Sequence, residues 1–218
     1  MDFRDATHRI LKLVEEKTGI PVRVTKDSTL PTHATVRMAR GNLPVHLVAY
    51  NPSKGPAPDY LICYQCGHIL RLFECAPDQR QEFVLKEHGR QAVREMLRTS
   101  LSMGRLPEAV QQQMVKQLFE GVMRQIRTYP IGIRVDDWIA REYPELRELQ
   151  ETSAKAQMQE NTQVLSPQVK QMAPEKIYRL SVAMNGAFAQ YWATRLSEPR
   201  FVAQYKVTPY WNFDIETH

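Results

Sequence analysis

The sequence predicts an α+β protein that is mostly helical and carries one small antiparallel sheet. Two observations predict this class. Apolar residues recur at helical spacing along most of the chain, and β-rich segments gather between residues 22 and 50. With 218 residues, of which 43% are hydrophobic, the chain is long enough to bury a core of its own.

The first elements follow from short-range signals. Residues 3–18 have helical apolar spacing, and Gly19 with Pro21 behind it marks the end of that helix. Three β-rich segments come next, separated by Pro, Gly, Asn or Asp: residues 22–24, 34–38 and 45–50. We expect these segments to form the antiparallel sheet.

A central helix is expected over residues 59–73, with Asp59 as its N-cap. Its apolar face has residues spaced four, three and four apart, namely Ile62, Cys66, Ile69 and Phe73. Because one whole face is apolar, we expect this helix to be buried.

The rest of the chain is predicted to be helical, and the predicted helices include residues 79–101, 107–127 and 136–142. We therefore divide the chain into an N-terminal domain, residues 1–103, and a helical region, residues 104–218, that packs on it. A Gln-, Ser- and Lys-rich stretch over residues 153–174 is expected to be a mobile helix or a linker.

The central helix contains five residues that match the positions of a zinc-peptidase motif. Zinc peptidases place two histidines four residues apart on a helix, with a glutamate beside the first as general base. Here those positions read Tyr64-Gln65-Cys66-Gly67-His68. A neutral phenol is a poor zinc ligand, and an amide cannot accept a proton from water at neutral pH. Gly67 indicates close approach of a strand over the helix.

The order of elements around the motif resembles the ImmA/IrrE family of zincin-like metallopeptidases over roughly residues 5–100. The resemblance implies a zincin-like core with a degenerate HExxH motif. It also implies a third metal-ligand position on the following helix, where Glu95 and His88 could join His68. The expected function is that of a non-catalytic, metallopeptidase-like protein. It would be a binding or regulatory component, with a protein partner, of a bacterial stress-response, mobile-element or phage-defence system.

Other metal chemistry stays open. In a rebuilt peptidase site, His68, Glu95 or His88, and Tyr64 or Cys66 would hold zinc. In a structural zinc knuckle, the ligands would come from Cys63, Cys66 and Cys75, although a knuckle needs a tight turn at the thiols. A redox pair at Cys63 and Cys66 is a further alternative, with buried, inert thiols as the simpler reading. The leading expectation is that the chain has no cofactor, with zinc as the alternative.

Arg90, Arg94 and Arg98 lie four residues apart on one expected helical face. Such a face is either simply solvated or binds phosphate groups or acidic partners, and a net charge of +5 allows nucleic acid as a ligand. No apolar stretch reaches the roughly 18 residues that a membrane span needs, and the N-terminus lacks a signal-peptide pattern. We therefore expect a cytoplasmic protein whose cysteines are reduced.

Overall fold

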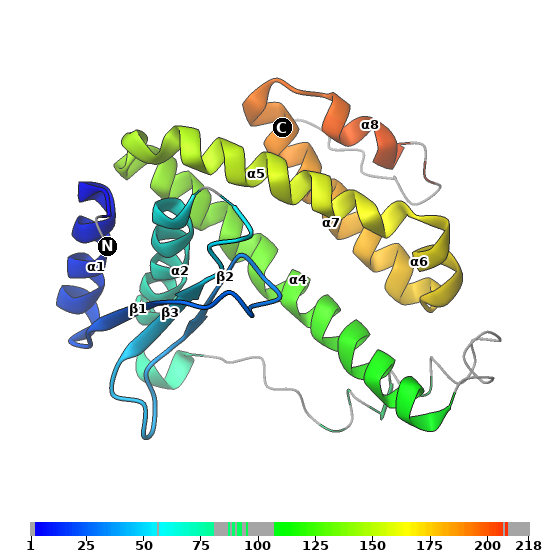
Figure 1. Cartoon of the computed structure of the whole chain (residues 1–218), viewed down its shortest axis with the longest axis horizontal. Helices are drawn as coiled ribbons and strands as arrows, with labels where there is room; N and C mark the ends of the chain where they lie inside the picture. Colours follow the sequence, from blue (N-terminus) through cyan, green and yellow to red (C-terminus); the bar gives the residue numbers. More distant parts are fainter. Residues whose placement is uncertain are drawn as a thin grey trace. The chain divides into compact units, whose positions relative to one another are not determined.

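The computed structural model describes residues 3–55, 57–80 and 107–206, together with residues 87, 89, 91, 92, 95 and 208. These residues are mostly helical and include one three-stranded sheet (Figure 1), which confirms the predicted α+β class. The chain divides into two compact units. The first comprises Met1–Glu82 and Pro130–Ala154, and the second comprises Phe83–Tyr129 and Lys155–His218.

The elements are labelled in Figure 1, where η marks a 3-10 helix. In chain order they are α1 (Asp5–Thr18), β1 (Val22–Lys26), β2 (Ala34–Arg37), β3 (His46–Tyr50), α2 (Pro58–Phe73), η1 (Pro77–Gln79), α4 (Glu108–Glu142), η2 (Pro144–Leu146), α5 (Arg147–Asn161), η3 (Thr162–Leu165), α6 (Pro167–Met172), α7 (Glu175–Leu196) and α8 (Arg200–Lys206).

The sheet has the strand order β1-β3-β2 and is mixed. Strand β3 runs antiparallel to β2 but parallel to β1, with Val22 opposite His46 and Lys26 opposite Tyr50. The prediction of an antiparallel sheet is therefore wrong for the β1–β3 pair. The last strand lies between the first two, and as the central strand it has the most buried alternate residues of the sheet. Turn residues predict where strands end, but not which strands pair.

The core of the first unit lies between the sheet and the helices α1 and α2, with part of α4. Helix α2 contacts α1 on one side and the strands β2 and β3 on another. The predicted apolar face of α2 is confirmed, since Ile62, Cys66 and Ile69 are fully buried. Other fully buried members of this core are Ile10, Val14, Val48, Val135, Ile139 and Leu146.

Asp59 caps a different helix from the one predicted. Helix α2 begins at Pro58, so Asp59 lies in its first turn and is not its N-cap. Its carboxylate instead accepts hydrogen bonds from the backbone N–H of Arg4, at 2.8 Å, and from the Thr7 hydroxyl, at 2.6 Å. Both donors lie at the start of α1, where the helix dipole favours a negative charge. Asp59 therefore joins α1 to α2.

Helix α4 is continuous through Pro130, although the sequence predicted two helices, 107–127 and 136–142. A proline inside a helix removes one backbone hydrogen bond, and packing of the residues after it offsets that loss. The residues 130–154, which the sequence analysis grouped with the C-terminal region, cluster with the first unit. A local apolar pattern shows that a segment is buried, but not which core it joins.

The second unit is helical in the part that the structure describes. Helix α8 packs against α7, and their buried residues include Val182, Phe188, Trp192, Val202 and Tyr205. Ser197, which ends α7, adopts a left-handed conformation (φ 54°), and the next N–H, from Glu198, bonds to the Ala193 carbonyl at 3.0 Å. The segment 153–174 is mostly helical, through α5, η3 and α6.

Among the helices that the structure describes, none combines the length and apolarity needed to cross a membrane. The predicted helix 79–101 falls largely outside the described residues.

His46 is a fully buried histidine at the start of β3. Its Nδ1 accepts a hydrogen bond from the Ala39 N–H at 3.0 Å, and its ring makes an edge contact with Phe73. No described residue bonds to its Nε2. Burial lowers the pKa of His46 below its ordinary value of 6.5, because a charged imidazole would lose its hydration.

The burial of His46 predicts that the first unit loses stability as the pH falls. Because the folded pKa is the lower one, the unfolded chain binds the proton first as pH falls. The contribution of neutral, buried His46 to the free energy of unfolding is therefore fully present above about pH 6.5 and is lost progressively below it. In His46→Asn, the amide oxygen can still accept from Ala39 but does not titrate. Urea unfolding of the first unit, followed by circular dichroism between pH 7.5 and 5, should show a flatter pH dependence in the variant than in the wild type. Equal slopes would contradict this assignment.

Candidate functional site

The five motif residues lie in one continuous stretch of α2. Cys66 and Gly67 are buried, whereas Tyr64, Gln65 and His68 are half-buried. The Tyr64 ring makes an edge contact with the His68 ring, with centroids 4.8 Å apart and planes at 76°. Residues four apart therefore share one side of the helix, as the motif spacing requires, and the phenol packs directly against the remaining histidine.

Helix α4 approaches this side of α2 at two glycines. A Cβ atom at Gly132 would overlap the hydroxyl oxygen of Tyr64, and one at Gly67 would overlap Cγ1 of Val135. Each helix thus lacks a side chain where the other helix projects one. The prediction that a strand passes over Gly67 is corrected, because the neighbour is a helix. The Tyr64 hydroxyl lies against the backbone of α4.

A buried polar cluster lies one helical turn before Tyr64. The Oδ1 atom of Asp136 accepts hydrogen bonds from the Tyr60 hydroxyl, at 2.6 Å, and from Nε2 of Gln150, at 3.0 Å. The same Nε2 also donates to the Asp136 backbone carbonyl at 2.9 Å. Asp136 and Gln150 are each only 2% exposed. One carboxylate therefore connects α2, α4 and α5 inside the first unit.

Asp136 was not predicted as a site residue. A signal for it exists in the chain, because Gly132, Val135, Asp136 and Ile139 fall at helical spacing on one stripe. A charged residue inside a buried stripe needs partners that satisfy it. Tyr60 and Gln150 supply them from elements 76 and 14 residues away in sequence.

The two helical cysteines have chemically inactive surroundings. Cys63 and Cys66 are fully buried, and the Cys63 thiol lies 3.7 Å from the Thr7 hydroxyl. Burial raises the pKa of Cys63 to about 12 and raises that of Cys66 as well. Since the thiolate is the form that binds metal or attacks disulfides, both remain thiols at neutral pH. Helix α2 also continues through both residues, without the turn that a zinc knuckle needs.

The structure does not gather the proposed cysteine ligands. Cys75 is exposed, unlike Cys63 and Cys66. Among the described residues, no three or more His, Cys, Asp or Glu side chains form a group that could hold a metal ion. Of the other candidates, Glu95 is helical and exposed. His88 lies outside the described residues, so the ligand set of His68, Glu95 and His88 stays a prediction. Arg90, Arg94 and Arg98 lie outside them too, and their role is equally untested.

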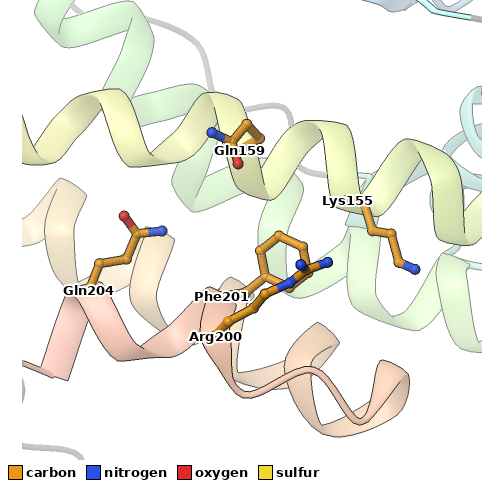
Figure 2. A pocket seen from close by; sticks show the side chains of 5 residues that line it. All are labelled: Lys155, Gln159, Arg200, Phe201 and Gln204. Atoms are coloured by element: carbon orange, nitrogen blue, oxygen red, sulfur yellow. The ribbon is translucent and has the colours of Figure 1, made fainter.

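The second unit contains a surface pocket of about 340 Å³ that the sequence analysis did not anticipate (Figure 2). Residues of α5 and α8 line it: Lys155, Gln159, Arg200, Phe201 and Gln204. No single segment carries a recognisable pattern for it, because each helix supplies only part of the lining.

Comparison with known proteins gives no relative. No protein-family model matches the chain, and neither a curated protein nor a solved structure is significantly similar to it.

The Gly67–Val135 contact generates a prediction about stability. Gly67→Ala should lower the free energy of unfolding by about 1–2 kcal/mol, since the cost of overpacking exceeds the gain in helix propensity. Adding Val135→Ala should recover part of that loss, which a double-mutant cycle in urea would measure. Gly121→Ala in α4 is the matched control, because a Cβ there meets no atom within 4 Å. The control should be neutral or stabilising. An unaffected Gly67→Ala chain would exclude the close approach.

The buried cluster generates a second prediction. Tyr60→Phe should destabilise the first unit by about 1.5–3 kcal/mol, because it removes a hydrogen bond to a buried carboxylate. Tyr143 offers a matched control. It is also buried, yet its hydroxyl donates to no described residue, so Tyr143→Phe should destabilise the chain much less than Tyr60→Phe does. The stability of both variants would be measured by thermal unfolding. Equal losses of stability in Tyr60→Phe and Tyr143→Phe would show that the Tyr60 hydroxyl does not stabilise the buried Asp136 side chain.

Proposed function

We propose that this chain is a non-catalytic, metallopeptidase-like protein that acts by binding a protein partner. The supporting observation is the chemistry at two positions of α2. Tyr64 stands where the first zinc-binding histidine would be, and Gln65 stands where the general base would be. The sequence order of helix, small sheet and motif helix agrees with the order expected for a zincin-like core.

The surroundings of Tyr64 argue further against a rebuilt zinc site. A phenol binds zinc only after losing its proton, and the Tyr64 ring is held between the His68 ring and Gly132 of α4. Polypeptide hydrolysis also needs a group that accepts a proton from water. Loss of a general base alone typically slows such reactions by roughly 10²- to 10⁴-fold.

Without the catalytic groups of a zinc peptidase, a protein of this kind would still bind a protein partner, and we propose that it acts in this way. The buried face of α2 packs on α1 and on the strands β2 and β3, whereas Gln65 and His68 are half-buried. From the resemblance to ImmA/IrrE proteins we infer a cytoplasmic role in a bacterial stress-response, mobile-element or phage-defence system.

Metal content and proteolysis test the proposal together. The full chain, purified without added metal, should contain far less than one zinc per chain by elemental analysis. It should also cleave an unfolded protein substrate no faster with zinc than with a chelator. His8→Ala, an exposed histidine of α1, is the matched control for His68→Ala.

Three results would decide against it. Stoichiometric zinc that His68→Ala removes and His8→Ala retains would indicate a working metal site on α2. Zinc lost only in Cys63→Ser and Cys66→Ser would indicate a cysteine site. Cleavage that a chelator stops would make the chain a peptidase.

A further inference from the structure

The pocket of the second unit is lined by two matching helical turns. On α5, Lys155 and Gln159 are four residues apart, and on α8, Arg200 and Gln204 are four residues apart. Each helix therefore presents one cation and one amide to the same space (Figure 2). Phe201 lies between them and is only 8% exposed, with the Arg200 guanidinium 5.1 Å from its ring centroid.

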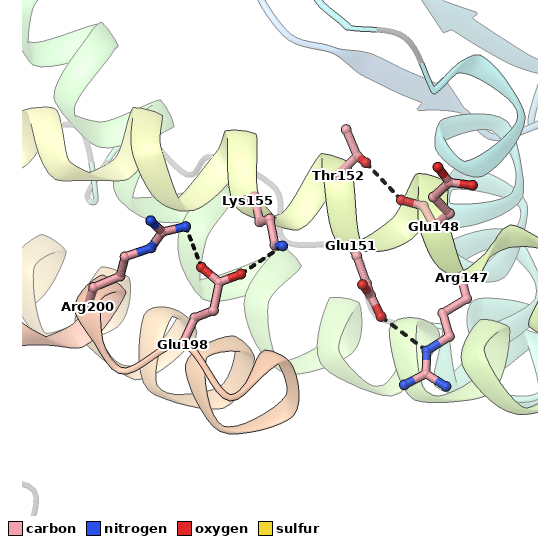
Figure 3. A network of polar contacts seen from close by, with 7 residues as sticks. All are labelled: Arg147, Glu148, Glu151, Thr152, Lys155, Glu198 and Arg200. Atoms are coloured by element: carbon pink, nitrogen blue, oxygen red, sulfur yellow. Dashed lines mark hydrogen bonds and ion pairs between the residues drawn. The ribbon is translucent and has the colours of Figure 1, made fainter.

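A carboxylate of the protein bridges the two cations. Glu198 Oε1 lies 2.7 Å from Lys155 Nζ, and its Oε2 lies 2.5 Å from Arg200 Nη2 (Figure 3). The hydrogen bond from Lys155 is the main cause that lowers the pKa of Glu198, so its carboxylate stays charged at neutral pH. The backbone N–H of Glu198 is bonded to the Ala193 carbonyl at 3.0 Å, so its backbone is held at the end of α7 while its side chain reaches the two cations.

The pocket has more positive charge and more donors than Glu198 uses. A guanidinium has five N–H donors and an ammonium has three. Within the part of the chain that the structure describes, Arg200 and Lys155 donate only to Glu198. The side-chain amides of Gln159 and Gln204 have no hydrogen-bond partner among these residues. An oxyanion with several oxygens would suit these donors, since Arg and Lys both bind phosphate and carboxylate groups strongly.

We propose that this pocket binds a small molecule carrying a phosphate or carboxylate group, and that the oxyanion competes with Glu198 for Lys155 and Arg200. A volume of about 340 Å³ is at the small end of the range for small-molecule sites. The carboxylate of Glu198 marks where the oxyanion would lie, and Phe201 offers a contact for an apolar part of the ligand. This site is independent of the function proposed for the first unit.

Direct titration of the full chain tests the pocket. Inorganic phosphate and succinate serve as probes, at constant ionic strength, with binding followed by calorimetry. Arg200→Gln and Lys155→Gln should each weaken binding by roughly tenfold or more, because each removes a charge-assisted hydrogen bond. Glu198→Gln should tighten binding by about three- to tenfold, because the competing charge is gone. The ratio of the two affinities identifies the preferred oxyanion.

Arg147→Gln is the matched control. Arg147 also lies on α5 and is exposed, and it pairs with Glu151 at 3.1 Å without lining the pocket (Figure 3). Its substitution should leave binding unchanged. If Arg147→Gln weakened anion binding as much as Arg200→Gln or Lys155→Gln does, the binding would reflect a general attraction of anions to the positive chain. That result would overturn the proposal. Absence of saturable binding in both the wild type and Glu198→Gln would overturn it too, as would a Glu198→Gln chain that binds no tighter than the wild type.

A second measurement does not depend on the variants folding. Amide NMR shifts of the wild-type chain, titrated with phosphate, should change most at residues 155–159 and 198–204. Changes concentrated elsewhere would place the anion outside this pocket and would contradict the proposal.

Discussion

The close crossing of α2 and α4 is the contact on which the first unit depends. Two glycines allow it, one on each helix, and each receives a side chain of the other helix. Interiors are packed too densely for an added methyl group to fit without displacement of its neighbour. The crossing therefore places Val135 of α4 in the core of the unit and determines the surroundings of Tyr64.

The same crossing explains why several polar groups of α2 are packed or hydrogen-bonded inside the first unit. Its tyrosines face α4, where Tyr60 donates to buried Asp136 and Tyr64 packs against Gly132. Its cysteines face the core, where burial raises the thiol pKa values. Groups that carry chemistry in other proteins are here hydrogen-bonded or packed. The pocket lined by α5 and α8 differs from this helix, because it presents the charged groups of Lys155 and Arg200 at the surface of the second unit.

Much of the fold could be predicted from local patterns. The three strand segments, the helix after them and its buried face at Ile62, Cys66 and Ile69 all follow from the spacing of apolar residues. The sheet order and the role of Asp59 could not be predicted, because both depend on partners distant in sequence. The site was predicted in part: the motif identified α2, whereas Asp136 and the pocket of the second unit depend on contacts between separate elements.

The sequence by itself determined which chemical groups the motif helix carries, namely a phenol at Tyr64 and at Gln65 an amide, which is not a general base at neutral pH. It also determined where the three strands and the helix α2 form, since apolar spacing is a local property of the chain, whereas the continuity of α4 through Pro130 did not follow from it. Only the tertiary structure decided what those groups touch. The parallel pairing of β1 with β3, the packing of α4 on Gly67, and the Glu198 bridge between Lys155 and Arg200 all join distant residues, and such contacts are selected by burial and charge in three dimensions.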